Sequence, residues 1–409
     1  MTGPAENVLL TRLGALPAAQ PLLARLDETD GVYLVGGAVR DLLLGGEPLD
    51  LDLVIDGDPE PVAGLLGTPA KIHDRFETRT VMLDGYSYDL ARARRETYSR
   101  PGALPTVSPA GIAEDLLRRD FTANALALGL SGTARGRLLE APHGREDVEA
   151  RRLRVLHDES FIDDPTRLLR LARYAARLGF TIEAHTRALA QAAVAARAPD
   201  LVSGPRIGAE LRLLAEQGDP VEGFRVLAEL GVDAALAPRF GIANDDRAAL
   251  ARRALDVLSD DGEPADLVLA VAALEVPPKE LKGLLARFAF PAVRRDRIVS
   301  ASARAGRLAQ QLGAATAPSQ IAAAVGAGSP ELVALAGAIG AERPARRWLD
   351  QLRHVRLEID GDDLLEAGVQ PGPAVGAGLA AARAAKLDGR VAGRDAELAT
   401  AMEAAQRQG

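Results

Sequence analysis

Hydrophobic and polar positions follow two different patterns along this chain of 409 residues. Before about residue 130, short apolar runs of strand length alternate with turn residues, which is typical of a mixed α/β region. After residue 160, Leu, Ala, Arg and Glu dominate, Gly and Pro interrupt them, and few β-branched runs remain. We therefore predict an α/β head followed by short helices that pack on one another.

Four apolar runs in the head have the length and composition of strands. They cover residues 31–35, 49–55, 80–83 and 86–93. The last two runs flank Asp84-Gly85, a strong signal for a two-residue hairpin turn. Gly36-Gly37 follows the first run and precedes AVRDLLL, which predicts a turn that leads into a helix.

The second run carries two acidic residues. Successive side chains of a strand point to opposite faces, so Asp50 and Asp52 should share one face while the neighbouring leucines share the other. Two carboxylates this close repel each other unless a cation lies between them, and Mg²⁺ binds through one or two carboxylates plus substrate phosphates. An edge strand with a solvated polar face is the competing interpretation.

Two features near the acidic pair favour a site for a nucleotide and metal ions. The Gly36-Gly37 turn places free backbone N–H groups and a helix N-terminus where a triphosphate could rest, with Arg40 one turn into the helix. Asp89, in YSYDLARAR, is a third strand carboxylate that could complete a two-ion site. A surface Asp on a hairpin is an equally good interpretation of Asp89.

The segment EDLLRRDFTANALAL (114–128) combines arginines with acidic and amide side chains. These residues crowd the start of an expected apolar helix and are Arg118, Arg119, Asp120 and Asn124. A capped and salt-bridged helix start would also explain them. The segment therefore supports a site only together with other motifs.

The segment DDPTRLLRLARYAARLGF (163–180) predicts a helix that Asp163 or Asp164 can cap and that Pro165 can begin. At 100° per residue, four arginines fall within one arc of about 120°, opposite Leu and Ala. They are Arg167, Arg170, Arg173 and Arg177. Such a face could simply be solvated. It could equally recognise a base edge and neutralise phosphates, because Asp accepts from an amino group and Arg donates in a planar fork.

Composition limits the kind of site. The chain has no Cys and five His, so a thiolate nucleophile is excluded and any metal should bind to oxygen. A net charge of −8 would not by itself suggest nucleic acid binding, although the arginines form local clusters. The sequence has no apolar run of 18 residues and no basic-then-apolar N-terminus, so we expect no membrane association and a cytoplasmic location.

Four motifs occur in an order that resembles the class II tRNA nucleotidyltransferase/poly(A) polymerase family. They are GGAVRDLLLG…DLDLVI, YDLARARRETY, EDLLRRDFTANA and DDPTRLLRLARYAARLGF. Each motif is weak alone, but the four in this order with these gaps are specific. Residues 202–214 also resemble the neck segment of the family, and residues 359–391 resemble the C-terminal segment of its CCA-adding members.

The resemblance implies an α+β fold. A small polymerase-β-type nucleotidyltransferase head, a mixed sheet with helices, would be followed by an all-α neck, body and tail. The expected parts are a head at 1–150, a neck for nucleotide selection and RNA binding at 151–240, a body at 241–340 and a tRNA-binding tail at 341–409. Some relatives carry a C-terminal phosphohydrolase domain built on His-Asp pairs. Beyond the neck loop only His185 and His354 remain, so we expect no such domain.

The activity implied by the resemblance is template-independent, metal-dependent nucleotide transfer. The enzyme would add C, C and A, or part of this sequence, to tRNA 3′ ends from CTP and ATP, with Mg²⁺ in a two-ion site and pyrophosphate as product. A poly(A) polymerase acting on RNA 3′ ends, and a CC-only or A-only tRNA enzyme, remain open alternatives. An RNA-binding protein with an inactive head is disfavoured, because all three strand carboxylates are present.

Roles follow from the resemblance by position. Asp50 and Asp52 would bind the metal ions, and Asp89 would be the third catalytic carboxylate. Asp164 and Arg167 would recognise the incoming base, while Arg170 and Arg173 would support them or contact phosphate. The other expected nucleotide-binding residues are Gly36, Gly37, Arg40, Arg119, Asp120 and Asn124.

Overall fold

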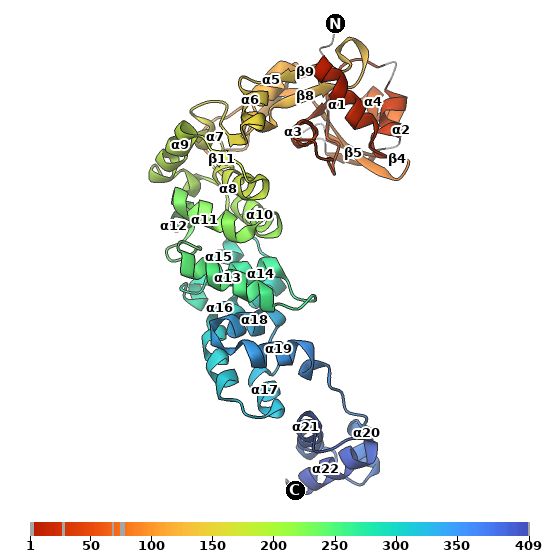
Figure 1. The fold of residues 1–409 in the computed structure, drawn as a ribbon, viewed down its shortest axis with the longest axis vertical. Helices are drawn as coiled ribbons and strands as arrows, with labels where there is room; N and C mark the ends of the chain where they lie inside the picture. Colours follow the sequence, from red (N-terminus) through yellow and green to blue (C-terminus); the bar gives the residue numbers. More distant parts are fainter. Residues whose placement is uncertain (1–3, 27–28, 68, 74–77, 408–409) are drawn as a thin grey trace. The chain divides into compact units, whose positions relative to one another are not determined.

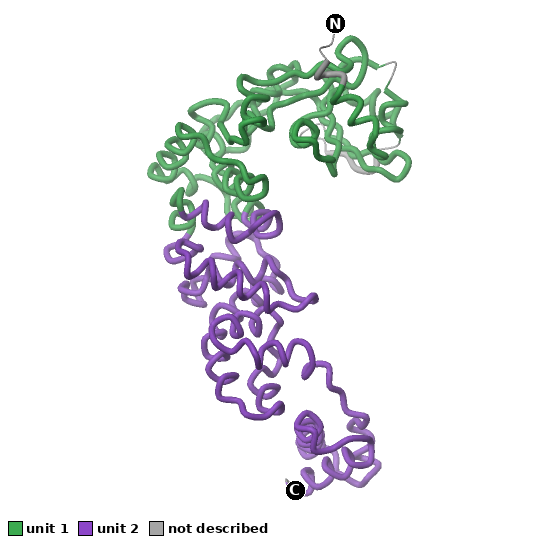
Figure 2. The backbone as a smooth tube through the Cα atoms, viewed as in Figure 1, with its two compact units in different colours: residues 1–210, 229–236 green, residues 211–228, 237–409 purple. Residues whose placement is uncertain are grey.

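The computed structural model describes residues 4–26, 29–67, 69–73 and 78–407, and it contains a mixed α/β head followed by helices (Figure 1). The α+β fold class is therefore confirmed. The chain forms two compact units (Figure 2). Residues 1–210 and 229–236 form the first unit, and residues 211–228 and 237–409 form the second. The finer division into head, neck, body and tail stays a prediction.

A mixed sheet forms the centre of the head. Within the described residues it has seven strands in the order β3-β4-β5-β2-β1-β8-β9. Strands β2 and β5 run parallel, and the other neighbouring strands run antiparallel. The strands are β1 (Val32–Val35), β2 (Leu53–Ile55), β3 (Pro69–His73), β4 (Thr78–Leu83), β5 (Tyr86–Arg92), β8 (Leu126–Gly129) and β9 (Leu138–Glu140). Since β1 and β8 are buried along their whole length, they form the core of the sheet.

Short helices cover the sheet. On one face, Ile112 and Leu116 of α5 pack against Tyr33 and Val35 of β1 in a buried apolar cluster. The alternation along β1 places this pair on a single face. The helices of the head are α1 (Pro4–Gly14), α2 (Gln20–Arg25), α3 (Gly37–Leu43), α4 (Pro59–Leu66), α5 (Ile112–Leu117) and α6 (Gly144–Glu149).

The predicted hairpin between β4 and β5 is confirmed. Leu83 pairs with Tyr86 across the turn. Between them, Asp84 has a φ of 50° and Gly85 a φ of 85°. Two successive residues with positive φ are what a type I′ turn requires, and the Asp-Gly pair supplies them at low cost.

A second hairpin, formed by β6 (Arg94–Thr97) and β7 (Thr106–Pro109), is separate from the main sheet. Its connecting loop is tied to α7 (Ser160–Asp163), because the Gly102 N–H donates to the carbonyls of Ile162 and Asp163, each at 3.2 Å. Gly102 has a φ of 69°, and a Cβ there would lie 2.8 Å from the Leu201 carbonyl oxygen. This contact therefore requires glycine.

The strand that carries the acidic pair is shorter than predicted. Strand β2 begins at Leu53, and Leu49 is 94% exposed instead of sharing the buried face with Leu51 and Leu53. Burial alternates only over Leu51, Asp52 and Leu53, because Val54 and Ile55 are both buried. The reason for the shorter strand is the partner strand, since β1 ends at Val35, whose N–H pairs with the Asp52 carbonyl at 3.1 Å. Residues before 52 have no further β1 residue to pair with.

The prediction of an apolar helix within residues 114–128 is wrong. Helix α5 ends at Leu117, a 3₁₀ turn η2 (Thr122–Asn124) follows, and Leu126–Gly129 forms strand β8 between β1 and β9. Residues 123–130 are all buried. A short run that is buried on every side lacks the polar face that distinguishes a helix from a strand in sequence.

The rest of the first unit is helical. Helix α8 (Thr166–Leu178) follows α7 and covers the predicted helix after Asp164. Helix α9 (Ala184–Ala195) follows, and α10 (Gly204–Glu216) continues from the first unit into the second. The two-stranded parallel pair β10 (Arg152–Leu153) and β11 (Thr181–Ile182) flanks α8 in sequence. Helix α11 (Pro220–Leu230) also includes residues of both units, whereas α12 (Val232–Leu236) belongs to the first unit.

The second unit consists of packed helices. Helix α14 is buried from Ala265 to Ala272 and packs against α13 and α16. Near the C-terminal end, α21 and α22 approach so closely that a Cβ at Gly378 would lie 2.6 Å from the Ala401 carbonyl oxygen. The helices are α13 (Asp245–Val257), α14 (Pro264–Ala272), α15 (Pro278–Arg287), α16 (Ala292–Ala314), α17 (Pro318–Val325), α18 (Pro330–Ala336), α19 (Glu342–Asp350), α20 (Gly361–Glu366), α21 (Pro373–Leu387) and α22 (Arg394–Gln406).

In the described part of the chain, we find no single helix with the length and apolar character needed to cross a membrane. One bent helix pair, Pro318–Val325 with Pro330–His354, meets these criteria by length and composition alone.

Candidate active site

A cavity of about 530 Å³ lies within the first unit, and we call it the main cavity. Nine of the sequence-predicted residues line it: Gly36, Gly37, Asp52, Arg119, Asp120, Asn124, Asp164, Arg167 and Arg170. Residues that sequence analysis did not assign to a site also line it, and they are Glu96, Tyr98, Arg118, Thr166, Tyr174, Arg206, Ala209 and Glu210. The predicted residues Asp50, Asp89, Arg40 and Arg173 do not contribute to this lining.

Three acidic side chains form the acidic end of the site: Asp52, which lines the main cavity, and Asp50 and Asp89, whose charges act on it. Asp50, Asp52 and Asp89 are all exposed. The partial burial of Asp52, followed by the charges of Asp89 and Asp50, raises the pKa of Asp52, and only Arg119 among the named causes lowers it. Asp50 and Asp89 are therefore close enough to Asp52 for their negative charges to act on it. This is the charge arrangement that a bound cation relieves.

The third carboxylate is oriented by its neighbour across the sheet. Thr80 of β4 pairs with Asp89 of β5, and the Thr80 hydroxyl donates to Asp89 Oδ1 at 2.6 Å. Within the described residues, no group of three or more His, Cys, Asp or Glu side chains is arranged to hold a metal ion.

The glycine turn lies beside these carboxylates. Gly36 has a φ of 69°, and a Cβ at this position would lie 3.0 Å from Arg119 Nη1. Both the backbone conformation and the nearby guanidinium therefore favour glycine. Gly37 is the first residue of α3, and both glycines line the main cavity.

Arg40 is placed differently from the prediction. Its side chain is buried, with 1% of the residue exposed. It donates to Asn124 Oδ1 at 2.5 Å and to Asp41 Oδ1 at 2.8 and 2.9 Å. Arg40 thus holds Asn124, which lines the cavity, and its own contact with a nucleotide stays a prediction.

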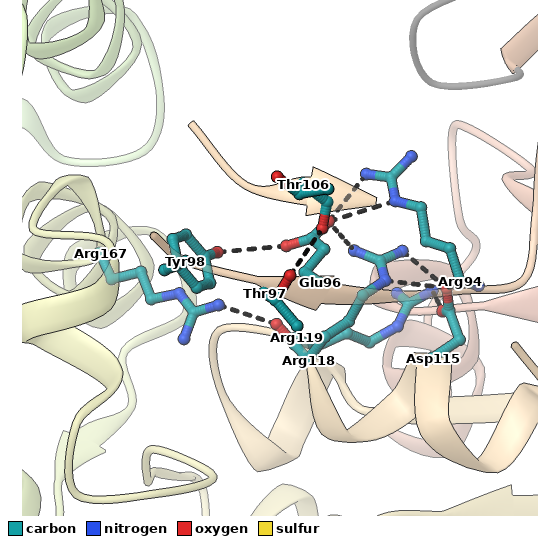
Figure 3. A network of polar contacts seen from close by, with 9 residues as sticks. All are labelled: Arg94, Glu96, Thr97, Tyr98, Thr106, Asp115, Arg118, Arg119 and Arg167. Carbon is teal, nitrogen blue, oxygen red and sulfur yellow. Dashed lines mark hydrogen bonds and ion pairs between the residues drawn. The ribbon is translucent and has the colours of Figure 1, made fainter. Parts of the chain in front are cut away.

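Two adjacent arginines are held by one buried carboxylate (Figure 3). Asp115 accepts from Arg118 at 2.7 and 2.9 Å and from Arg119 at 3.0 Å. Burial alone would raise the pKa of Asp115, but these two guanidinium groups hold it below its ordinary value. Arg119 keeps a buried Nε that has no hydrogen-bond partner among the described residues, so it has donor capacity left for an anionic ligand.

A chain of ion pairs forms another part of the cavity lining. Arg170 donates to Asp120 Oδ2 at 2.5 and 3.0 Å and to Glu210 at 3.3 Å, and Arg173 donates to Glu210 at 3.1 Å. Burial would raise the pKa of Asp120, but Arg170 and the hydrogen bonds it receives lower it to about 2. Tyr174 lies beside both arginines, with the Arg173 guanidinium carbon 4.8 Å from its ring centre.

The arginine face predicted for residues 163–180 is mostly internal. Arg167 and Arg173 are 5% and 6% exposed, which excludes a solvated face at these two positions, whereas Arg177 is exposed. Arg167 donates to Ser160 Oγ at 2.6 Å and to the Arg118 carbonyl at 2.8 Å. These bonds fix the guanidinium where it lines the cavity.

Asp164 lies next to Arg167 and has a partner that sequence analysis missed. Its Oδ1 accepts from the Thr166 N–H at 3.1 Å and hydroxyl at 2.7 Å, and from Arg206 at 2.8 Å. Arg206 also donates to the Gly102 carbonyl at 3.0 Å. The segment 202–214 was noted as a motif, but nothing in its pattern pointed to Arg206 as the residue that contacts Asp164.

Comparison with known proteins identifies the family of this chain. A family model described as the poly A polymerase head domain matches residues 32–154. The A-adding tRNA nucleotidyltransferase of Halalkalibacterium halodurans is 35% identical over 378 residues, which cover 89% of this chain and 84% of that protein. The CC-adding tRNA nucleotidyltransferase of Deinococcus radiodurans is 36% identical over 373 residues, which cover 89% of this chain and 87% of that protein.

Solved structures show the same fold. The apo form II structure of a CCA-adding enzyme has a TM-score of 0.80 and 29% identity, and it covers 98% of this chain and 96% of its own. The Thermotoga maritima CCA-adding enzyme complexed with tRNA has a TM-score of 0.78 and 27% identity, with 97% of each chain covered. The resemblance stated from four motifs is confirmed, and this chain belongs to the tRNA nucleotidyltransferase family of enzymes.

Proposed function

We propose that this protein transfers nucleotides from CTP, ATP or both to the 3′ end of tRNA, completing all or part of the CCA sequence and releasing pyrophosphate. The main cavity is the observation that carries this proposal. It joins the Gly36-Gly37 turn and Asp52 to the Asp164–Arg167 pair within one space of about 530 Å³. The named activities of the A-adding and CC-adding relatives support it. The cytoplasm, where tRNA is found, is the location that fits this substrate.

The acidic end fits a divalent cation. Asp50 and Asp52 would hold magnesium, with Asp89 as a third carboxylate. The pKa of Asp52 is raised first by burial and then by the charges of Asp89 and Asp50, which a bound cation would offset. Bound metal would lower the pKa of the attacking RNA hydroxyl and stabilise charge on the leaving pyrophosphate. The protein keeps Asp89 in place through Thr80, and it leaves all three carboxylates exposed for a substrate to approach.

The phosphates of the donor would lie against Gly36, Gly37 and Arg119. Gly36 lacks a side chain, so the ligand can approach the backbone closely, and the Arg119 guanidinium lies beside this glycine. The unpartnered Nε of Arg119 supports a role in binding an anionic group. Asp115 keeps this guanidinium in position before the substrate arrives.

The base would be selected by Asp164 and Arg167. Cytosine and adenine each present an amino group next to a ring nitrogen that accepts, so one acceptor and one donor on the protein match both bases. Asp164 supplies the acceptor and Arg167 the donor. Uracil and guanine present the reverse order at these positions and would leave both protein groups unpaired.

One assay tests the proposal and separates full from partial activity. The protein is incubated with tRNA transcripts ending before CCA, after C and after CC, with CTP or ATP supplied singly and together, and product lengths are determined on a gel. We expect each accepted nucleotide to extend only those transcripts that end immediately before its position in the CCA sequence. An A-rich RNA serves as the control, because its repeated extension with ATP alone would identify a poly(A) polymerase. Failure to extend any transcript would reject the proposal.

A further inference from the structure

A second cavity of about 480 Å³ shares residues with the main cavity. The residues that line both are Glu96, Tyr98, Arg118 and Arg167, and we call them the shared wall. The other residues that line the second cavity are Arg95, Thr97, Glu114, Leu117, His157 and Asp163. The main cavity could therefore become deeper if one member of the wall were smaller.

Tyr98 is the aromatic member of this wall, and Figure 3 shows its hydroxyl directed at Glu96. The hydroxyl donates to Glu96 Oε2 at 3.2 Å, while Glu96 Oε1 accepts from Arg94 and Arg118, each at 3.0 Å. Burial is the main cause that raises the pKa of Tyr98 to about 12, and Arg167 opposes it. The hydroxyl therefore stays protonated at neutral pH and keeps donating to a carboxylate whose two oxygens are both occupied.

The backbone around Tyr98 is also fixed. Tyr98 directly follows β6, whose partner is β7, and the loop after it is held by the hydrogen bonds of Gly102 to α7. Arg206 connects the same loop to Asp164, because it donates to the Gly102 carbonyl and to Asp164 Oδ1. The tyrosine ring and the base-selecting carboxylate therefore have a common support.

We propose that the Tyr98 ring sets how far a base can extend into the main cavity, and that Tyr98 is thereby a specificity-determining residue for purines against pyrimidines. This inference rests on the proposed function. With the triphosphate held at the Gly36-Gly37 turn, the reading edge of a purine lies further from the phosphates than that of a pyrimidine. The position of the wall beside Arg167 therefore favours one base size over the other.

The test compares CTP and ATP in the full-length protein and in variants of Tyr98. Tyr98→Ala deepens the main cavity, Tyr98→Trp makes it shallower, and Tyr98→Phe keeps the ring but removes the bond to Glu96. We measure dissociation constants for both nucleotides and kcat/KM on tRNA transcripts. The preference for ATP over CTP is expected to rise about tenfold in the alanine variant and to fall in the tryptophan variant. The phenylalanine variant should stay within about twofold of the parent.

Thermal unfolding of each variant shows whether it is folded, and Tyr98→Leu replaces the alanine variant if that one is not. The inference is overturned if folded alanine or leucine and tryptophan variants shift the nucleotide preference in the same direction or leave it unchanged. It is also overturned if the phenylalanine variant changes the preference as much as alanine does, because the hydroxyl would then be the important group. A parent protein that binds neither nucleotide and extends no transcript would instead reject the proposed function.

Discussion

The carboxylates around the main cavity fall into two groups with opposite electrostatics. Asp50, Asp52 and Asp89 are exposed, and their mutual repulsion contributes to the raised pKa of Asp52. Asp120 and Glu210 are instead enclosed by arginines, and the pKa of Asp120 is lowered to about 2. The first group is in a state that a cation would improve, whereas the second has its partners within the protein. Acidic residues in one cavity can thus serve ligand binding or folding, and the partners decide which.

The largest expected difference between the two groups of carboxylates is in nucleotide incorporation. Replacing Asp52 with Ala should reduce nucleotide incorporation by at least about a thousandfold, because this side chain would hold the metal beside the reacting phosphate. Incorporation of labelled CTP or ATP into tRNA measures it, and binding of tRNA should be retained. Substantial turnover by a folded Asp52→Ala protein would contradict the metal assignment.

The second group should instead control stability. Asp120→Ala removes the closer of the two carboxylate partners of Arg170 and leaves this partly buried guanidinium with Glu210 alone, so the free energy of unfolding should fall by about 3 kcal/mol. Urea unfolding measures this change. The matched control is Asp200→Ala, which removes the exposed partner of Arg197 and should cost less than about 1 kcal/mol. Equal decreases in the free energy of unfolding of both variants would show that the ion pair of Asp120 contributes no more to stability than an exposed ion pair does.

Selectivity among the four nucleotides should change when Asp164 or Arg167 is replaced. Asp164→Ala or Arg167→Ala should weaken discrimination among the four nucleotides by about tenfold to a hundredfold, with a smaller effect on turnover of the preferred nucleotide. Single-turnover incorporation with each nucleotide separately gives the ratios. Asp163→Ala, at the neighbouring position that does not line the main cavity, is the control. Unchanged ratios in the Asp164 and Arg167 variants would remove the basis for base selection by this pair.

The smallest expected effect is that of Asp52 on the free energy of unfolding. Ionisation of Asp52 lowers this free energy, whereas ionisation of Asp120 raises it. The folded-state pKa of Asp52 is raised, so ionisation of Asp52 opposes folding, and stability falls as pH rises from 3.8 through the raised pKa. Asp52→Asn removes this penalty and should raise the unfolding temperature slightly at neutral pH without metal. For Asp120 the contribution is complete above pH of about 4 and is lost as pH falls through about 2. A lower unfolding temperature of Asp52→Asn would contradict the assigned repulsion.

Sequence analysis predicted much of the site because the chemistry-bearing residues occur in short motifs. It located Asp52, Arg119, Asp164 and Arg167, which all line the main cavity. It missed Glu210, which meets the predicted Arg170 across 40 residues, and Arg206, which meets Asp164 across 42. Such pairings depend on how helices pack, and no local pattern encodes them.

Local patterns also failed where burial removed the contrast between polar and apolar faces. The run after Asn124 was expected to be helical and forms strand β8, because it is buried between β1 and β9. The strand expected at 49–55 is shortened because β1 ends at the glycine turn. In both cases, the neighbouring strand decided the structure of the segment.

Every residue that lines the main cavity belongs to the first compact unit. The described residues of 237–409 therefore contribute no side chain to the lining of the main cavity. A chimaera that joins residues 1–236 of this chain to the corresponding C-terminal helices of a relative should keep the nucleotide preference of this protein.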